Sequence, residues 1–596
     1  MKFKTFSEYL RNLEKTSSRI EITKILAELF KITSIEEIDK VTYLSLGTLA
    51  PSYKGIVFNL AERMMVRILA KAYGKKVENV TKLYKKEGDL GTVAEELSKS
   101  KSEGKRENVT VIEVYEKLVA IAQEHGVESQ ERKIAEMAKL LSGLDPLSAR
   151  FVARIPVGRL RLGFSDRTVL DALSWMETGS KSKSKKIEEA YFILPDVGML
   201  AKKVKEQGID KATENVKPVV GVPVLPMLPQ RIKSPSEMIK KMGKVFVEPK
   251  FDGLRVLIHF KRGHPEFISG SKILRRVQDD RSVDFIRTFT RNLNNVVDMF
   301  SELKEVGKHI KASEVILDTE AIGMDPEMKK MANFQTTMQR RRKYNIEEKA
   351  ISIPLKFQVF DIIYKDGESF MEMPYNKRRE ILKKTITNDK LLVVDEAIVT
   401  TDPKVINREY REKIKMGLEG VIVKKYDTKY VPGRTGWRWV KMKMEEEASG
   451  KLADTVDCVV MGYTGGRGKR AAFGLGQFLV GVLDNDEDLP AGRQVKTVTK
   501  VGTGLTDEQF RELKRRLKGL EVKEKPKNYL VNKLLEPDYW VTPEIVVEIA
   551  ADEITKSPTH TAGLALRFPR LIKFRDDKSY EEATTVGELK NLFKLQ

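Results

Sequence analysis

Apolar residues recur at three- and four-residue intervals through most of the first third of the chain. The pattern is clearest in residues 20–30 and 111–119, where aliphatic side chains are interleaved with charged ones. This spacing places the apolar side chains along one face of an α-helix, where they can pack against neighbouring helices. From Phe3 to about Leu194 the pattern therefore predicts a bundle of helices.

Two short stretches rich in lysine and serine interrupt this helical pattern, at residues 98–105 and 180–186. Runs of small and charged residues have no apolar face to bury. We expect solvated loops at both places, although basic loops can also follow a phosphate backbone.

The pattern changes in a proline-rich passage at residues 217–229, which lacks helical periodicity. From about Val222 to Met444, short β-rich runs are broken by glycine, which predicts a mixed α/β domain. Further β-type runs at residues 455–461 and 477–483 predict a β-rich final domain. We therefore predict three domains, at residues 1–216, 217–444 and 445–596.

Composition agrees with several domains and suggests an acidic partner. A chain of 596 residues is too long for one compact core. Its formal net charge of +22 favours anionic partners, most simply nucleic acid, although charge alone does not separate DNA from RNA or an anionic membrane. The first residues lack an apolar signal core, and no apolar run is long enough to cross a bilayer. We expect a soluble cytoplasmic protein without a membrane partner.

The chain contains a single cysteine, Cys458. One thiol cannot form an intrachain disulfide, a cysteine-ligated iron–sulfur cluster or a multi-cysteine zinc site. The sequence therefore excludes these sites.

Candidate chemistry centres on Lys250, which follows an apolar run at residues 245–247 and precedes Asp252, Gly253 and Arg255. An amine attacks only when it is uncharged, and a nearby cation together with partial burial favours the uncharged form. Glycine would let the backbone approach a bound phosphate closely. A surface hairpin with ordinary charges explains these residues equally well.

Residues 250–255 resemble the Lys-x-Asp-Gly-x-Arg signature of ATP-dependent DNA ligases, in which the lysine accepts AMP from ATP. Counterparts of the further motifs of that family follow in the same order at residues 290–293, 317–320, 360–364, 419–424 and 439–443, and at 567–570 leading to 575–578. Such an ordered series is far more specific than one motif. The absence of a four-cysteine zinc module also separates the chain from NAD-dependent DNA ligases, which resemble one another in having it.

The resemblance covers nearly the whole chain, including residues 141–150 and 155–163, which resemble the DNA-binding domain of the family. There, Arg159 and Arg161 would contact phosphates, unless they are only surface arginines beside helix caps. The implied fold is multidomain: an all-α DNA-binding domain, an α+β nucleotidyltransferase (adenylation) domain and a β-barrel OB-fold domain.

The resemblance implies an ATP-dependent DNA ligase that seals nicks in duplex DNA in replication, repair and recombination. AMP would be placed on Lys250, passed to the 5′-phosphate at the nick and displaced by the adjacent 3′-hydroxyl. RNA ligases and mRNA-capping guanylyltransferases share the lysine motif but lack the helical domain. A non-catalytic DNA-binding scaffold is a further alternative. The presence of the motif residues Lys250, Glu320, Glu419 and Lys441 argues against it.

The same resemblance assigns Lys250 as the nucleophile, with Asp252 orienting its loop. Beyond Lys250 itself, it implies nucleotide contacts for Glu248, Arg255, Arg291, Glu320, Phe360, Arg434 and Lys441. Arg291 and Glu320 would hold the ribose side, and Phe360 would stack on adenine unless it is an ordinary core residue. Arg434 stands one place before Thr435, the position at which the family usually has an arginine.

Two carboxylates, Glu320 and Glu419, are the candidate ligands for Mg²⁺, which favours a few carboxylate oxygens together with water and phosphate. Either could instead be an ordinary ion-pair partner. Lys424, Lys441 and Lys443 offer positive charges to phosphate oxygens, and strand alternation puts the last two on one face. The alternative for these lysines is a solvated basic strand edge.

In the last domain the resemblance implies that the segment from Arg567 to Lys578 acts against pyrophosphate. Its candidate residues are Arg567, Arg570, Arg575, Asp576 and Lys578, preceded by a basic stretch at residues 466–470. A hinge at residues 444–450 would let this domain move over ATP and then grip DNA.

The expected cofactors are ATP and Mg²⁺, and the expected partner is nicked double-stranded DNA, bound by a monomer associated with the nucleoid. A sliding clamp is a further candidate partner, although no convincing clamp-binding peptide stands out. Whether ADP or NAD replaces ATP stays open. Two stretches, at residues 265–283 and 489–495, look like insertions relative to the family, and we assign neither a catalytic role.

Overall fold

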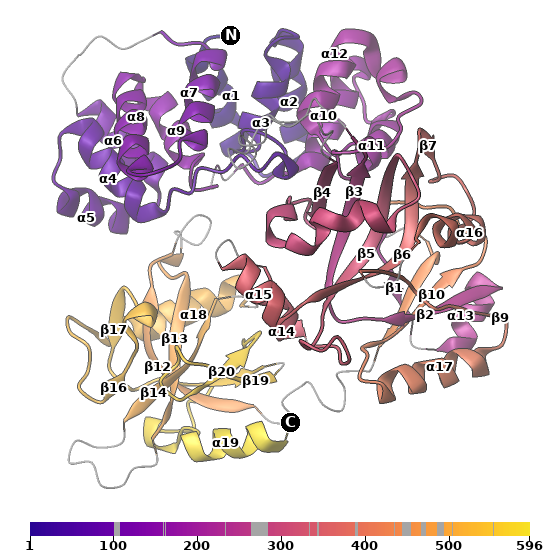
Figure 1. Cartoon of the computed structure of the whole chain (residues 1–596). Helices are drawn as coiled ribbons and strands as arrows, with labels where there is room; N and C mark the ends of the chain where they lie inside the picture. Colours follow the sequence, from indigo (N-terminus) through magenta and orange to yellow (C-terminus); the bar gives the residue numbers. More distant parts are fainter. Residues whose placement is uncertain are drawn as a thin grey trace. The chain divides into compact units, whose positions relative to one another are not determined.

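The computed structural model describes residues 1–100, 108–158, 160, 162–232, 234–263, 284–332, 334–341, 345–387, 391–433, 436–443, 455–466, 473–484, 494–502, 505–551 and 553–595. The chain divides into two compact units. The first contains Met1–Ala61 and Lys105–Met444, and the second contains Glu62–Gly104 and Glu445–Gln596. Figure 1 labels most of the helices and strands of both.

The amino-terminal part of the first unit is helical, as the apolar spacing predicted. Its helices are α1 (Phe3–Glu14), α2 (Arg19–Ile32), α3 (Ile38–Ser45), η1 (Ser52–Lys54), α7 (Val111–Gln123), α8 (Ser129–Gly143), α9 (Pro146–Arg154), α10 (Asp166–Thr178), α11 (Ser184–Ile193) and α12 (Val197–Thr213). Apolar faces point inward; α1 buries Phe3, Phe6, Leu10 and Leu13. Three further helices, α4 (Glu62–Tyr73), α5 (Val77–Glu87) and α6 (Leu90–Lys99), belong to the second unit.

The prediction of a free loop at residues 180–186 is wrong in part, because α11 already begins at Ser184. Acidic residues of α10 and α12 hold the lysines of this stretch. Lys183 lies 3.0 Å from Glu177 and 2.8 Å from Asp210, and Lys181 lies 2.6 Å from Asp171. Of the other predicted loop, residues 101–105 lie outside the described residues.

The rest of the first unit contains two β-sheets. The first sheet has the order β1-β11-β10-β2-β9, and the second has the order β4-β3-β5-β6-β7, with β8 paired to β6. The strands are β1 (Gln230–Arg231), β2 (Val245–Lys250), β3 (Leu254–Lys261), β4 (Phe285–Thr290), β5 (Glu314–Gly323), β6 (Leu355–Lys365), β7 (Glu368–Ser369), β8 (Leu392–Val394), β9 (Ile398–Thr400), β10 (Gly420–Lys425) and β11 (Trp439–Lys443).

Strand alternation separates the two faces of the first sheet. Val245, Val247 and Val440 join an apolar cluster with α13 (Pro235–Met242) and α17 (Pro403–Lys415). Successive side chains of a strand point to opposite faces, so Glu248 and Lys250 lie on the face away from these helices. Trp439, which shares the alternate positions of β11 with the lysines at 441 and 443, packs in a cluster with side chains of the second sheet.

Helices and short turns complete this part of the unit. They are α14 (Phe334–Met338), α15 (Ile346–Ser352), α16 (Tyr375–Thr385), η3 (Val297–Met299) and η4 (Ser301–His309). The proline-rich passage before β1 is anchored to the second sheet, because the Gly221 amide donates to Nδ1 of His259 at 3.1 Å. Burial lowers the pKa of His259 to about 3, which keeps the ring neutral and able to accept this bond.

The carboxyl-terminal part of the second unit is β-rich. Its elements are β12 (Val456–Thr464), β13 (Gln477–Leu483), β14 (Val495–Val501), α18 (Asp507–Leu517), β15 (Glu521–Val522), β16 (Tyr529–Leu530), η6 (Lys533–Leu535), β17 (Tyr539–Val541), β18 (Val546–Ala550), β19 (Glu553–Lys556), β20 (Leu564–Arg567), β21 (Arg570–Phe574), η7 (Tyr580–Glu582) and α19 (Val586–Leu595).

The predicted barrel is seen only in part. Strand pairing follows the order β15-β17-β12-β13-β14-β16, with β18 joining β12 to β21, and β19 pairs only with β20 among the described strands. This pairing forms an open sheet and a separate hairpin over a shared apolar core. Cys458 of β12 is fully buried in that core, and burial raises the pKa of its thiol. No described helix is long and apolar enough to cross a membrane.

Candidate active site around Lys250

Lys250 ends β2, and the strand register brings a glutamate to it. Gly420 of β10 pairs with Lys250, and the Glu419 amide donates to the Lys250 carbonyl at 3.0 Å. The Lys250 amine forms an ion pair with the Glu419 carboxylate. Because β10 also pairs with β11, Lys443 lies 3.4 Å from the other oxygen of Glu419. One carboxylate thus bridges two of the predicted site lysines.

Two glycines permit the close packing at this place. Gly420 has φ +143°, and a Cβ there would collide with the Met442 carbonyl of β11. A Cβ on Gly253, in the turn after Lys250, would collide with the Ala321 carbonyl of β5. Both positions therefore hold backbone against backbone where a side chain has no room.

Glu248 is buried in a network of donors. Its carboxylate lies 2.6 Å from Lys424 and 3.2 Å from Arg379, and it also accepts a hydrogen bond from the Tyr375 hydroxyl. Burial, and then the charge of Glu248, raise the pKa of Tyr375, so this phenol stays protonated and donates. These donors fix the position of the Glu248 carboxylate, and Glu248 stands two residues before Lys250 on the same strand.

Lys424 lies among three aromatic rings. Its ammonium is 4.7 Å from the ring centre of Phe360, 4.6 Å from that of Tyr375 and 4.3 Å from that of Trp439. A cation over ring faces is attracted by their quadrupoles, and burial strengthens the attraction. Lys424 therefore joins the two sheets and is not a solvated strand edge.

Arg255 is held by a carboxylate that the sequence analysis did not single out. Its guanidinium binds Asp318 at 2.9 and 2.6 Å, and the Tyr430 hydroxyl donates to the same carboxylate at 2.8 Å. Burial alone would lower the pKa of Arg255, but the charge of Asp318 and its hydrogen bonds to the guanidinium, with smaller contributions from Tyr430 and Glu320, together raise the pKa. The guanidinium carbon lies 5.2 Å from the ring centre of Phe360.

Glu320 pairs across the second sheet with Arg255. Burial raises the pKa of Glu320 to about 7, although the charges of Arg255 and Lys250 oppose this shift. The charge of Glu419 contributes to the same shift, so Glu320, Lys250 and Glu419 share one electrostatic environment. Among the described residues, no group of three or more His, Cys, Asp or Glu side chains could hold a metal. Two carboxylates with phosphate oxygens and water suit Mg²⁺.

The other nucleotide candidates lie in different settings. Arg291 is exposed in the turn after β4, while Phe360 is partly buried on β6 with its ring 5.9 Å from that of Trp439. Asp252 follows Lys250 in an exposed turn, and Lys441 is partly buried on β11. Outside the described residues lie Arg434, Arg159 and Arg161, the hinge at 444–450, the basic positions 467–470 and the insertions at 265–283 and 489–493.

Three basic candidates of the second unit bind acidic residues of the same unit. Arg575 and Lys578 converge on Asp457 at 2.8 and 2.7 Å, and Arg575 also lies 2.7 Å from Asp577. Asp576 does not join this cluster and instead forms an ion pair with Arg516 of α18. Separately, Arg567 lies 2.9 Å from Glu553, and Arg570 Nη1 donates to the Phe568 carbonyl at 3.5 Å.

Sequence reasoning missed Asp318, Tyr375, Arg379 and Tyr430, which fix Arg255 and Glu248. Asp318 had a signal, because it stands two residues before Glu320 on one strand and shares its face. The other three come from distant segments with no motif of their own.

Family models match three consecutive parts of the chain. These are the DNA ligase N terminus at residues 2–174, the ATP dependent DNA ligase domain at 275–443 and the ATP dependent DNA ligase C terminal region at 471–578. A probable DNA ligase of Dictyoglomus turgidum is 40% identical over 605 residues, which cover 100% of this chain and 98% of the relative. The chain belongs to the ATP-dependent DNA ligase family.

Archaeal members of the ATP-dependent DNA ligase family are similar over the same length. The DNA ligase of Aeropyrum pernix is 37% identical over 100% of this chain and 98% of its own. The solved structure described as Pmar-Lig_PreS3 shares the fold, with a TM-score of 0.52 and 17% identity over 96% of this chain and 99% of that one. Members of this family depend on ATP, so ATP is the nucleotide cofactor of the chain.

Proposed function

We propose that this protein seals nicks in duplex DNA through AMP bound covalently to Lys250. The observation that carries the proposal is the ion-paired Lys250 amine, held at a strand end beside Glu419, Lys443 and Glu320. The amine first gives up a proton and attacks the α-phosphorus of ATP, so that a P–N bond forms as the bond to pyrophosphate breaks. Such a reaction depends mainly on positioning and charge neutralisation.

The remaining steps return Lys250 to its free state. A 5′-phosphate oxygen at the nick attacks the same phosphorus and breaks the P–N bond. The adjacent 3′-hydroxyl then attacks the 5′-phosphate, and AMP leaves. Lys441 and Lys443 face phosphate oxygens. Phe360, whose ring lies close to both Arg255 and Lys424, stacks on adenine. Glu320 and Glu419 would hold Mg²⁺, which stabilises the charge on phosphate oxygens when bound.

The remaining predicted nucleotide contacts belong to the same proposal. Glu248 and Arg255 lie beside the nucleotide, held in place by the buried donors and the carboxylate described above. Asp252 orients the Lys250 loop, Arg291 holds the ribose side, and Arg434 completes the set. The segment with Arg567, Arg570, Arg575, Asp576 and Lys578 acts on pyrophosphate.

The domain assignment is part of the proposal. Residues 1–216 would bind DNA, residues 217–444 would carry out adenylation, and residues 445–596 would form an OB-fold whose half-barrel sheet is the part described. The protein would act as a monomer on nicked double-stranded DNA, with a sliding clamp as a candidate recruiter. The net charge of +22 supports a polyanionic substrate.

Nucleotide transfer to the protein tests the central step. Incubation with α-labelled ATP and Mg²⁺ is expected to leave label on the protein, and Lys250→Ala should abolish the label because the variant lacks the amine that attacks the α-phosphorus. Lys308→Ala is the control, because Lys308 is an exposed lysine paired with Glu305.

Both variants should still bind a nicked duplex. Label that persists in Lys250→Ala would contradict the assignment. Transfer of GMP from GTP in preference to AMP would favour the capping alternative.

A further inference from the structure

A second concave site lies at the opposite end of β10 from the nucleophile. Its lining is formed by Lys241, Lys425, Asp427, Thr428, Lys429, Trp437 and Arg438, around a cavity of about 320 Å³. The register pairs Lys425 with Val245, the first residue of β2, whereas Lys250 is the last. The pocket is therefore separate from the site at Lys250.

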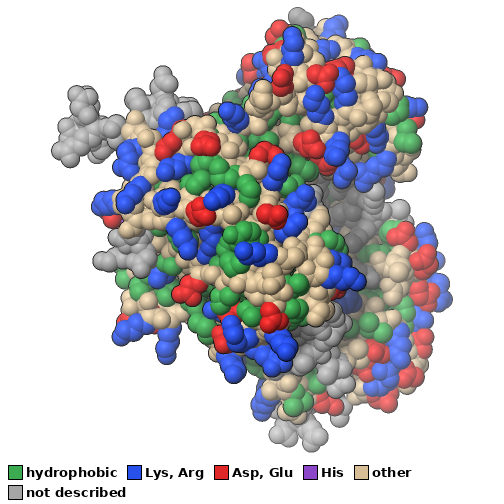
Figure 2. All heavy atoms as spheres, turned by 90° about the vertical axis from the view of Figure 1, so that its right-hand side faces the viewer, with side chains coloured by type: hydrophobic (Ala, Val, Ile, Leu, Met, Phe, Trp, Pro, Cys, Tyr) green, Lys and Arg blue, Asp and Glu red, His purple; other side chains and the backbone are tan. Residues whose placement is uncertain are grey.

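Cations dominate the lining. Four of its seven side chains are basic and one is acidic. The nitrogen of Lys425 lies 3.8 Å from Asp427, and Lys429 pairs with the exposed Glu372 at 2.6 Å. Exposed ion pairs of this kind contribute little, so an incoming anion can replace them at small cost. Figure 2 views the side on which Figure 1 labels α13 and α17 and shows Lys and Arg side chains spread over it.

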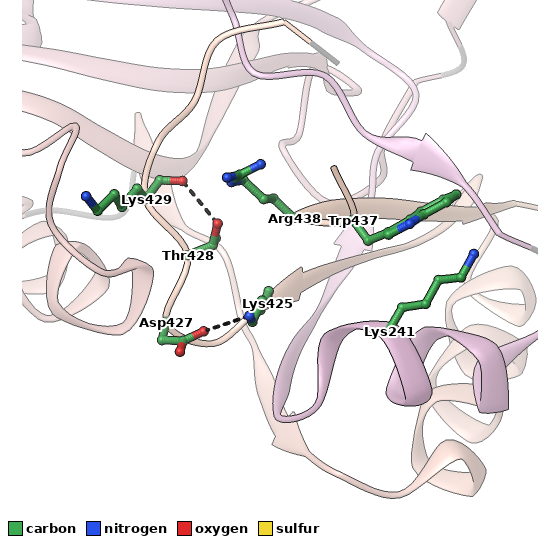
Figure 3. A pocket seen from close by; sticks show the side chains of 7 residues that line it. All are labelled: Lys241, Lys425, Asp427, Thr428, Lys429, Trp437 and Arg438. Carbon is green, nitrogen blue, oxygen red and sulfur yellow. Dashed lines mark hydrogen bonds and ion pairs between the residues drawn. The ribbon is translucent and has the colours of Figure 1, made fainter. Parts of the chain in front are cut away.

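An indole stands among these charges. Trp437 is 38% exposed, and the Lys241 ammonium lies 3.7 Å from its ring centre. Figure 3 shows Trp437 and Lys241 together on one side of the pocket, with Lys429 and Thr428 on the other and Arg438 between them. An exposed aromatic face beside cations is the combination with which proteins bind single nucleotides of a strand, by stacking the base and neutralising the phosphate.

We propose that this pocket binds a nucleoside phosphate unit, with the base stacked on Trp437 and the phosphate held by Lys425, Lys429 and Arg438. Its volume suits one nucleotide and lies at the lower end of the range for small-ligand sites. The unit can come from a single-stranded segment of nucleic acid or from a free nucleotide. Either source would meet a site that takes no part in the chemistry at Lys250.

Photocrosslinking on the whole protein tests the site directly. The protein is first charged with AMP on Lys250 and freed of pyrophosphate, so that the catalytic nucleotide site is filled. It is then irradiated with a short thymidine oligonucleotide that carries 5-iodouracil, and the adduct is mapped by mass spectrometry. An adduct on Trp437 is expected. Adducts confined to other segments would overturn the proposal.

Matched variants measure the two parts of the contact by fluorescence anisotropy with the same oligonucleotide. Trp437→Ala should weaken binding about tenfold and Trp437→Phe much less, because the phenyl ring still stacks. Lys429→Gln should weaken it a few-fold, whereas Lys308→Gln should not, although each lysine is exposed and pairs with an exposed glutamate. Lysyl-AMP formation unchanged in Trp437→Ala shows that the variant is folded. Equal affinity of Trp437→Ala and the unaltered protein would contradict the stacking.

Competition identifies the source of the nucleotide. Thymidine monophosphate that blocks the crosslink as well as the unlabelled oligonucleotide does would point to a free nucleotide, and a block by the oligonucleotide alone would point to a single strand. Both results support the site. Polyglutamate that competes as well as the oligonucleotide at equal charge would overturn it, because the pocket would then recognise charge without a base.

Discussion

Two sets of charged residues belong to the same series of sequence motifs but differ in burial. One set lies in the two β-sheets around Lys250, and the other lies in the carboxyl-terminal part of the second unit. In the sheets, the side chains of Lys424 and Glu248 are 2% and 1% exposed, and Asp318 beneath Arg255 is fully buried. In the carboxyl-terminal part of the second unit, Arg567 and Glu553 are 46% and 42% exposed, whereas Arg575 and Asp457 are 17% and 11% exposed. The pairs of Glu248 and Asp318 have given up water, and the Arg567–Glu553 pair has kept much of it.

This difference decides which contacts can change partners. A buried charge that loses its partner has neither a partner nor water, which costs several kcal/mol. An exposed charge that loses its partner is rehydrated at once. The buried pairs therefore fix the positions of Glu248 and Arg255. The exposed Arg567–Glu553 pair can be exchanged for phosphate oxygens, which the proposed action of this segment on pyrophosphate would require.

The largest effect is expected on breaking a buried pair. Arg255→Ala leaves Asp318 with Tyr430 as its remaining partner and should lower the free energy of unfolding by about 3–5 kcal/mol. Urea unfolding followed by near-ultraviolet circular dichroism measures it. The double variant Arg255→Met with Asp318→Leu should recover most of the loss because no charge stays buried. A loss below about 1 kcal/mol in the single variant would contradict the contrast in burial.

A medium effect is expected where burial acts on one carboxyl group. The pKa of Glu320 is raised to about 7, so the folded protein holds a proton there that the unfolded chain releases at lower pH. Stability from this group is therefore present at low pH and lost as the pH rises through 7. Glu320→Gln should raise the free energy of unfolding by about 1–3 kcal/mol at pH 8 and change it little at pH 5.

Unfolding in urea at both pH values, on the protein without metal or nucleotide, measures this effect. A change equal at pH 8 and pH 5 would show that Glu320 is not desolvated. The same variant should lose lysyl-AMP formation at both pH values, because an amide cannot replace the carboxylate as a metal ligand.

The smallest effect on stability is expected in the carboxyl-terminal unit. Although Arg575 and Asp457 are 17% and 11% exposed, Arg575→Ala should cost less than Arg255→Ala, about 1 kcal/mol, because Lys578 still pairs with Asp457 and Asp577 is 64% exposed. It should slow AMP transfer to Lys250 by about tenfold or more, since a pyrophosphate contact is lost. Sealing by protein that already carries AMP should suffer less. Lys573→Ala is the matched control, two residues away and paired with Glu548 at 3.5 Å.

Local patterns predicted the parts of the site that depend on neighbours in sequence. The alternation along β11 put Trp439, Lys441 and Lys443 on one face, and the helical spacing of the first third of the chain was confirmed. The partners of Glu248 could not be predicted, because Tyr375 and Arg379 lie on a helix more than a hundred residues away. Such pairings depend on how the sheets pack, which periodicity does not encode. The roles assigned to the site residues stay predictions.

The pairing of the strands in the last domain also could not be predicted from the sequence. The β-type runs of the sequence predicted β12 and β13, but such runs do not say which strand edges meet. Among the described residues, β19 and β20 pair only with each other and not with the main sheet.

The burial of Cys458 makes the chain well suited to distance measurements by site-directed labelling. Its only native thiol is inaccessible within a β-strand and held in its unreactive, protonated form. A maleimide dye would therefore attach only to cysteines introduced on purpose. A donor and an acceptor placed on the two units would report their separation in single molecules, with no need to remove a native residue first.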